Sequence, residues 1–135
     1  MLSGGGGADT LIGGLGKDTL MGGAGQDVFQ FNSAAEAGRT LASRDVIVDF
    51  KHLVDKIDIS GIDPDAATPL DQSFTFIGTQ GFSHSIGELR YTKINLAGTV
   101  NDITLVEGDS NGDGVADLRI ELKGLVTLTG GDFVL

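Results

Sequence analysis

Aspartate recurs every nine residues near the N-terminus of this 135-residue chain, at Asp9, Asp18 and Asp27. A glycine-rich segment precedes each aspartate, and a large apolar residue follows it two positions later. The three segments read GGGGADTLI, GGLGKDTLM and GGAGQDVFQ, so each fits GGxGxDxUx with U a large apolar residue. Carboxylates and glycine carbonyls together supply hard oxygen ligands, of which Ca²⁺ takes about 6–8. The spacing therefore predicts calcium sites built from repeated turns.

The spelling of the repeat predicts how its residues are positioned. The six residues GGxGxD form a tight turn with backbone conformations that residues carrying a Cβ adopt only at a cost. The three residues xUx form a short strand whose central side chain points inward, at Leu11, Leu20 and Phe29. Nine residues make half a coil, so two repeats complete one turn of a solenoid. This nonapeptide resembles the calcium-binding repeat of RTX proteins. The alternative, a flexible glycine-rich linker, gives no reason for the regular aspartates.

The charge and hydrophobic content of the chain exclude some classes of binding partner. The chain carries 19 acidic and 9 basic residues, a formal net charge of -10, which argues against nucleic acid and anionic membrane surfaces. The same charge makes the compact state repel itself unless cations bind. A hydrophobic content of 40% is compatible with a packed core, and no apolar run is long enough for a membrane span. There is no cysteine, and the N-terminus has no pattern of a Sec-type signal peptide. We expect a C-terminal piece of a longer protein.

The segments after the repeats carry a more specific resemblance. A decayed fourth repeat covers residues 31–36, where Glu36 stands nine residues after Asp27. DVIVDF follows at 45–50 and alternates like a strand, and DKIDISGID begins at Asp55. In this order the segments resemble the C-terminal domain of serralysin-type secreted metalloproteases, over nearly the whole chain. The resemblance implies an all-β fold, a right-handed parallel β-roll (the RTX solenoid) continuing into a β-sandwich-like C-terminal cap. Residues 1–36 would form the roll, and residues 37–135 the cap with a secretion signal at 132–135.

The resemblance also implies the calcium ligands. Each site takes carbonyls and the aspartate of one repeat together with carbonyls and the acid two repeats later. One site then consists of Gly5, Gly7 and Asp9 with Gly22, Ala24 and Asp27. A second consists of Gly14, Gly16 and Asp18 facing Glu36. Acids matching Asp45 and Asp55 close the last sites, with Gly23, Gly25 and Asp27. The alternative for Asp45 and Asp55 is that they are solvated acids of a strand and a turn.

A second acidic loop, DSNGDGVAD, covers residues 109–117. Its oxygen side chains fall at positions 1, 3, 5 and 9, as in the first half of an EF-hand loop, and Gly114 stands at the sharp turn. The flanking segments alternate like strands, so the loop resembles calcium loops of β-hairpins. Its predicted ligands are Asp109, Asn111, Asp113 and Asp117. The alternative is a turn rich in Asp and Asn that needs no metal.

The remaining residues predict no catalytic site. Neither His52 nor His84 belongs to an HExxH motif, and there is no cysteine nucleophile, so we expect a module that is not an enzyme. The resemblance implies a secreted, extracellular protein, with an N-terminal catalytic or effector domain and the ABC exporter of type I secretion as partners. The last four residues, DFVL, resemble the uncleaved type I signal, or else form a final core strand. An alternative function is a glycan-binding, adhesin or surface-layer appendage, which the single Tyr and absent Trp place second.

Overall fold

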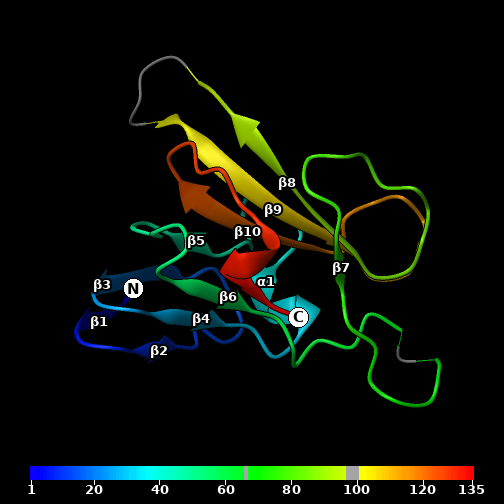
Figure 1. The fold of residues 1–135 in the computed structure, drawn as a ribbon, viewed down its shortest axis with the longest axis horizontal. Helices are drawn as coiled ribbons and strands as arrows, with labels where there is room; N and C mark the ends of the chain where they lie inside the picture. Colours follow the sequence, from blue (N-terminus) through cyan, green and yellow to red (C-terminus); the bar gives the residue numbers. More distant parts are fainter. Residues whose placement is uncertain (66, 97–100) are drawn as a thin grey trace.

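The computed structural model describes residues 1–65, 67–96 and 101–135, which form two sheets and very little helix (Figure 1). The larger sheet has seven strands in the order β1 (Leu2–Gly6), β3 (Thr19–Ala24), β5 (Val46–Ile47), β10 (Leu118–Lys123), β9 (Ile103–Asp109), β8 (Glu88–Ile94) and β7 (Thr75–Phe76). The smaller sheet has four, in the order β11 (Phe133–Val134), β6 (Lys56–Asp58), β4 (Val28–Gln30) and β2 (Thr10–Leu11). One helical turn, α1 (Ala34–Ala37), and a 3-10 turn, η2 (Gly130–Asp132), complete the described elements.

Strand register confirms the coil of two repeats. Leu2 of β1 pairs in parallel with Leu20 of β3, and Leu11 of β2 with Phe29 of β4, so paired residues are 18 apart. The chain thus alternates between the two sheets, and each inward apolar residue of the repeat is buried. In the next coil the spacing grows, because Leu20 pairs with Ile47 and Phe29 with Ile57. The extra residues lie mainly in segment 31–45, which carries α1 where a six-residue turn would suffice.

Both sheets of the roll continue without a break into the cap. β10 joins β5 in parallel, and β9 and β8 then extend the large sheet as antiparallel strands. β11 adds to β6 and completes the small sheet. The all-β fold with a parallel β-roll and a sandwich-like cap is therefore as predicted. The sheets run across the predicted division at residue 36, and that division stays a prediction. Among the described residues no helix is long and apolar enough to cross a membrane.

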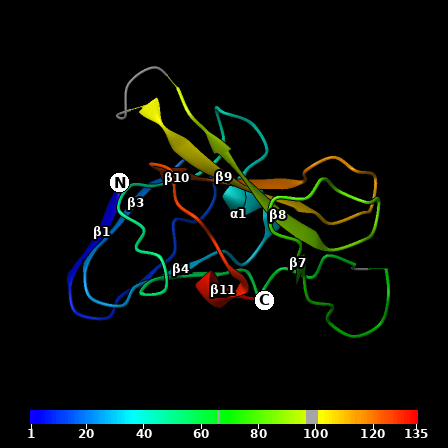
Figure 2. The ribbon, with the colours of Figure 1, turned by 45° about the horizontal axis from the view of Figure 1, so that its top comes forward.

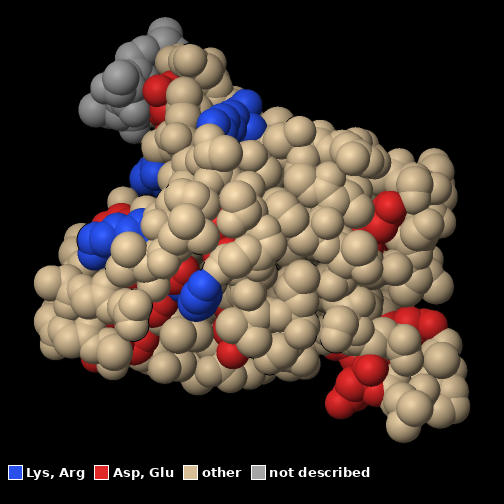
Figure 3. Space-filling view, in the orientation of Figure 1, with Lys and Arg blue, Asp and Glu red and all other residues tan. Residues whose placement is uncertain are grey.

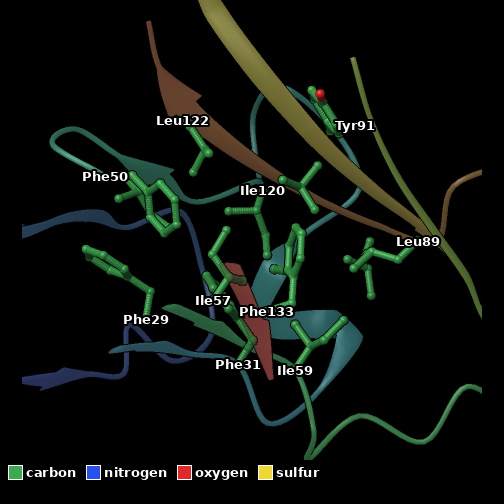
Figure 4. Packing of buried hydrophobic residues seen from close by; sticks show 14 of the residues in the cluster. Phe29, Phe31, Phe50, Ile57, Ile59, Leu89, Tyr91, Ile120, Leu122 and Phe133 are labelled. Carbon is green, nitrogen blue, oxygen red and sulfur yellow. The ribbon is translucent and has the colours of Figure 1, made fainter. Parts of the chain in front are cut away.

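The two sheets lie one above the other (Figure 2), and a hydrophobic cluster between them joins roll and cap (Figure 4). From the roll, Phe29 packs against Phe50, with ring centroids 6.2 Å apart. From the cap, Phe133 of β11 lies 5.1 Å from the ring of Phe76. Because the cluster draws on both parts, the roll has an apolar base against which its glycine-rich turns are ordered.

Candidate metal centre

The turns that join the two sheets stack in two columns. The first column contains turns 4–9, 22–27 and 49–55, which lead from β1 to β2, from β3 to β4 and from β5 to β6 (left in Figure 1). The second column contains turn 13–18 and segment 31–45. We call the spaces between neighbouring turns the first gap (4–9 to 22–27), the second gap (22–27 to 49–55) and the third gap (13–18 to 31–45). These gaps are where the sequence predicts calcium.

Aspartates form a ladder along both columns. The backbone N–H of Asp9 donates to Oδ1 of Asp27 at 3.1 Å, and the N–H of Asp27 donates to Oδ1 of Asp55 at 3.1 Å. In the second column the N–H of Asp18 donates to Oδ1 of Asp45 at 2.7 Å. Each of these carboxylates is therefore fixed through its Oδ1 by the turn before it.

The second oxygen of three of these carboxylates has no partner. Oδ2 of Asp9, Asp27 and Asp45 is buried and accepts no hydrogen bond. Burying a charged oxygen without a donor is costly, and such groups are paired or coordinate metal ions. Ca²⁺ is a hard cation that prefers this kind of ligand. The unpartnered oxygens therefore fit an ion in the first gap, where Asp9 and Asp27 lie, and in the third, where Asp45 lies.

Glycine is required where the first column stacks most closely. A Cβ on Gly23, at φ +96°, would collide with the carbonyl oxygen of Gly5. A Cβ on Gly25, at φ +138°, would collide with that of Gly7. The carbonyls of Gly5 and Gly7 thus face the next turn, as the predicted ligand set requires. The carbonyl of Ala24, another predicted ligand, accepts the N–H of Gly7 at 2.7 Å.

The third gap brings two carboxylates to one point. A Cβ built on Gly13 would lie 2.9 Å from Oδ2 of Asp45 and 3.1 Å from Oδ2 of Asp18. The pKa of Asp45 is raised to about 6, mainly by burial and also by the nearby carboxylates of Asp18 and Glu36, while a hydrogen bond from the Asp18 backbone lowers it. A cation in this gap would relieve both the burial cost and the repulsion.

Register places Asp45, rather than Glu36, opposite Asp18. Thr19 pairs with Val46, so the acids that precede them align 27 residues apart instead of 18. Glu36 lies in α1, where its Oε2 accepts the N–H of Asn32 at 2.9 Å. The repeat interval alone missed this pairing. The signal that could have found it is Asp-x-apolar, which recurs in Asp45-Val46-Ile47 and again in Asp55-Lys56-Ile57.

Side-chain carboxylates alone do not make these centres. Among the residues that the structure describes, no three His, Cys, Asp or Glu side chains converge on a common point. An ion in either gap would therefore take most of its ligands from backbone carbonyls, as the glycine-rich spelling predicts.

In the loop at 109–117, backbone N–H groups of the loop itself donate hydrogen bonds to its acidic side chains. Asp109 is fully buried, and its carboxylate accepts the N–H groups of Asn111 at 3.2 Å, Gly112 at 2.7 Å and Gly114 at 2.7 Å. Asn111 and Asp113 likewise accept N–H groups two residues ahead, from Asp113 and Val115. These contacts are the ones expected of the metal-free turn, and ion binding by this loop stays a prediction.

Asp117, the last predicted ligand of this loop, also has partners of its own. Its Oδ1 lies 2.6 Å from the guanidinium of Arg39, and its Oδ2 accepts from the hydroxyl and N–H of Ser110 at 2.7 and 3.0 Å. An ion at Asp117 would have to displace the arginine or share the carboxylate with it.

The C-terminal residues are part of the core. Asp132 is fully buried and accepts hydrogen bonds from the N–H of Leu53 at 2.8 Å and of Thr129 at 2.7 Å, and pairs with the His52 ring at 2.8 Å. Burial raises its pKa, but these donors outweigh burial and bring the pKa below its ordinary value. The expectation of a final core strand is met by β11 (Phe133–Val134), and a role in secretion stays a prediction.

Comparison with known proteins now decides the family. The family described as peptidase M10 serralysin C terminal matches residues 3–135. The chain belongs to this family. The serralysin C-terminal family is an RTX-type, calcium-binding and non-catalytic module, and its members belong to secreted proteins. None of the curated proteins compared with the chain matched it.

A solved structure shares this fold. The AlgE6R3 subunit of the Azotobacter vinelandii mannuronan C5-epimerase is similar to this serralysin C-terminal module with a TM-score of 0.64 and 26% identity. That match covers 98% of this chain, which spans 66% of the length of the epimerase subunit. The AlgE6R2 subunit matches with a TM-score of 0.48 and 24% identity, over 99% of this chain and 86% of the other.

Two residues of the first column were not singled out from the sequence as part of a site. Asp49 accepts the N–H groups of Gly22 at 2.9 Å and Gly23 at 2.8 Å, and Lys51 donates through Nζ to the carbonyl of Gly23. Neither residue belongs to a nonapeptide, and a lysine beside predicted calcium ligands gives no pattern to search for. Only the fold brings them beside turn 22–27.

Proposed function

We propose that this chain folds when Ca²⁺ enters the first and third gaps after export, and that it then stabilises the C-terminal end of a larger extracellular protein such as a protease. The observation that carries this proposal is the set of buried Oδ2 atoms of Asp9, Asp27 and Asp45 that no donor reaches. Without a cation these charges oppose folding of the roll. With a cation they become ligands.

The first gap would take carbonyls of Gly5, Gly7, Gly22 and Ala24 with the carboxylates of Asp9 and Asp27. The third gap would take carbonyls of Gly14 and Gly16 with Asp18 and Asp45. Ca²⁺ would supply the positive charge, and the residues would supply the oxygen ligands.

Glycine-rich turns explain why folding would wait for the ion. Glycine loses more backbone freedom on folding than other residues, and these turns bury little apolar surface in return. Extracellular calcium modules bind at about 10⁻⁴–10⁻³ M, a range that separates the low-calcium cytosol from the medium. Binding then stabilises the native state by mass action. An exporter of the type I class would meet an unfolded roll inside the cell.

Circular dichroism of the whole chain tests the folding proposal. Chelator should abolish the β signal of the roll, and millimolar Ca²⁺ should restore it, whereas Mg²⁺ at the same concentration should not. A roll that keeps its full signal and thermal transition in chelator would contradict the proposal.

The export role can be tested without removing the core strand. Phe133 is 7% exposed and Asp132 is buried, so deleting residues 132–135 would damage the fold as well as any signal. Val134 is 42% exposed, and Leu125, outside the proposed signal, is 41% exposed. Val134→Ser in the parent protein should reduce export while leaving Ca²⁺-dependent folding intact, and Leu125→Ser should change neither. Equal export of both variants and the wild type would contradict a signal at 132–135.

A glycan-binding, adhesin or surface-layer appendage is the second proposal. A cleft of about 590 Å³ lies beside α1 and is lined by residues that include Ala34, Thr40, Ser43, Arg39 and Asp117. Small-molecule sites commonly combine a few polar groups with apolar and aromatic walls, and the described lining of this cleft contains no aromatic residue. Ca²⁺-dependent retention on a glycan array would promote this function.

A further inference from the structure

The second gap differs from the other two because its carboxylates are saturated. Oδ1 of Asp55 accepts the N–H of Asp27 at 3.1 Å, and Oδ2 accepts the N–H of Lys51 at 2.8 Å. Asp49 uses both oxygens on the N–H groups of Gly22 and Gly23. Asp55 is buried like Asp27 and Asp45, yet neither of its oxygens lacks a partner. The buried oxygen without a donor that marks the first and third gaps is therefore missing at Asp55.

A positive charge already stands at this gap. Nζ of Lys51 donates to the carbonyl oxygen of Gly23, an atom that the repeat pattern assigns to calcium. Lys51 belongs to turn 49–55, and its ammonium reaches back across the gap to turn 22–27. Basic side chains lie beside acidic ones over the roll in Figure 3. An ammonium satisfies a carbonyl with N–H donors and brings one positive charge where an ion would bring two.

The turn that carries Lys51 is also built differently. The backbone carbonyl of Lys51 accepts the N–H groups of Val54 at 3.1 Å and Asp55 at 2.9 Å, so this carbonyl is used within the turn. Leu53 adopts φ +60° where a glycine would be free of strain. Turns 4–9 and 22–27 instead direct glycine carbonyls at their neighbours. Turn 49–55 therefore offers a lysine where a repeat turn would offer carbonyl oxygens.

We propose that the ammonium of Lys51 replaces a calcium ion in the second gap, so that the first column holds its ion only between turns 4–9 and 22–27. This inference rests on the proposed function, the calcium-dependent folding of the roll. The first column would then end its metal-dependent stack with an internal cation, and turn 49–55 would be held against turn 22–27 without metal.

Calcium stoichiometry of the full chain tests the inference. Lys51→Met removes the ammonium but keeps an unbranched side chain, and Lys51→Arg keeps the positive charge. Lys93→Met is a matched control. Lys93 is exposed on β8 and donates to Thr127, and neither residue belongs to the turns of the two columns. Isothermal titration with CaCl₂ after chelator removal should show one more ion per chain for Lys51→Met than for the wild type, Lys51→Arg and Lys93→Met. Circular dichroism at saturating Ca²⁺ checks that each variant folds.

The outcomes separate the two proposals. Equal stoichiometry in all four proteins would overturn the role of Lys51 while leaving the calcium-dependent roll intact. Failure of Lys51→Met to fold at saturating Ca²⁺, where Lys51→Arg folds, would also overturn it, because an ion should take the place of the ammonium. A wild type that binds no Ca²⁺ at all would instead overturn the proposed function.

Discussion

Two acidic, glycine-rich regions of this molecule use aspartate in opposite ways. In the roll, Asp27 holds one backbone N–H and keeps a buried oxygen without a donor. In loop 109–117, the two carboxylate oxygens of Asp109 accept hydrogen bonds from three N–H groups of the same turn. Similar residue types therefore produce a site that demands a cation and a turn that is complete without one. The difference lies in what the neighbouring chain supplies: a stacked second turn in the roll, and the loop's own amides in the hairpin.

The largest effect expected from this comparison is at Asp27. Asp27→Asn removes the charge of a buried ligand in the middle turn of the first column and should abolish the ion of the first gap. The matched change Asp109→Asn should lower stability at saturating Ca²⁺ by about 1–3 kcal/mol, the cost of disturbing a buried hydrogen-bond acceptor. It should leave the number of bound ions unchanged. Calorimetric titration and urea unfolding of both variants distinguish the two roles, and loss of an ion from Asp109→Asn would reverse the comparison.

The next effect is at Asp132, which joins the C-terminus to turn 49–55. Asp132→Asn weakens hydrogen bonds to a charged acceptor, each worth about 1.5–3 kcal/mol. Because the folded-state pKa is lowered, the stability from Asp132 is present above its unfolded value of 3.8 and is lost as pH falls through the folded value. Urea unfolding in Ca²⁺ between pH 7 and pH 3 should show that the free energy of unfolding falls less steeply with decreasing pH in the variant than in the wild type. Parallel curves for wild type and variant would show that Asp132 contributes no such linkage.

Asp45 should respond to pH in the opposite direction. Its folded-state pKa without calcium is raised to about 6, so its contribution to stability is full below 3.8 and is lost as pH rises through about 6. Protons therefore compete with Ca²⁺ in the third gap. Calcium affinity should fall between pH 7 and pH 5, with proton release measurable from titrations in buffers of different ionisation enthalpy. Asp45→Asn should bind one ion fewer and lose this proton release. An unchanged proton release would show that the proton comes from a group other than Asp45.

The smallest effect is expected at the ion pair between Arg39 and Asp117. The arginine side chain is 58% exposed, and exposed pairs contribute about 0–1 kcal/mol. Arg39→Ala should therefore change the thermal midpoint little, and should not change calcium stoichiometry if loop 109–117 binds no ion. A gain of one ion in Arg39→Ala would show that the arginine had been holding a metal ligand.

Much of the roll could be predicted from the sequence because the repeat pattern is local. The nonapeptide determines both the turn and the inward residue, so Leu11, Leu20 and Phe29 were predicted to be inward and are buried. The spacing could not show that segment 31–45 folds out as a longer excursion, which moves Asp45 opposite Asp18. Nor could it place Lys51, because its contact with Gly23 depends on stacking of turns 28 residues apart in sequence. In the hairpin loop, the motif could not reveal how far the backbone amides would satisfy Asp109.

Anomalous diffraction from crystals grown in Ca²⁺ would test the central claim most directly. The account predicts ion density between Asp9 and Asp27 and between Asp18 and Asp45, each bound to the oxygen atoms that lack a donor here. It predicts none between Gly23 and Asp55. Ions confined to loop 109–117, with the Oδ2 atoms of Asp9, Asp27 and Asp45 bound to no metal, would contradict it.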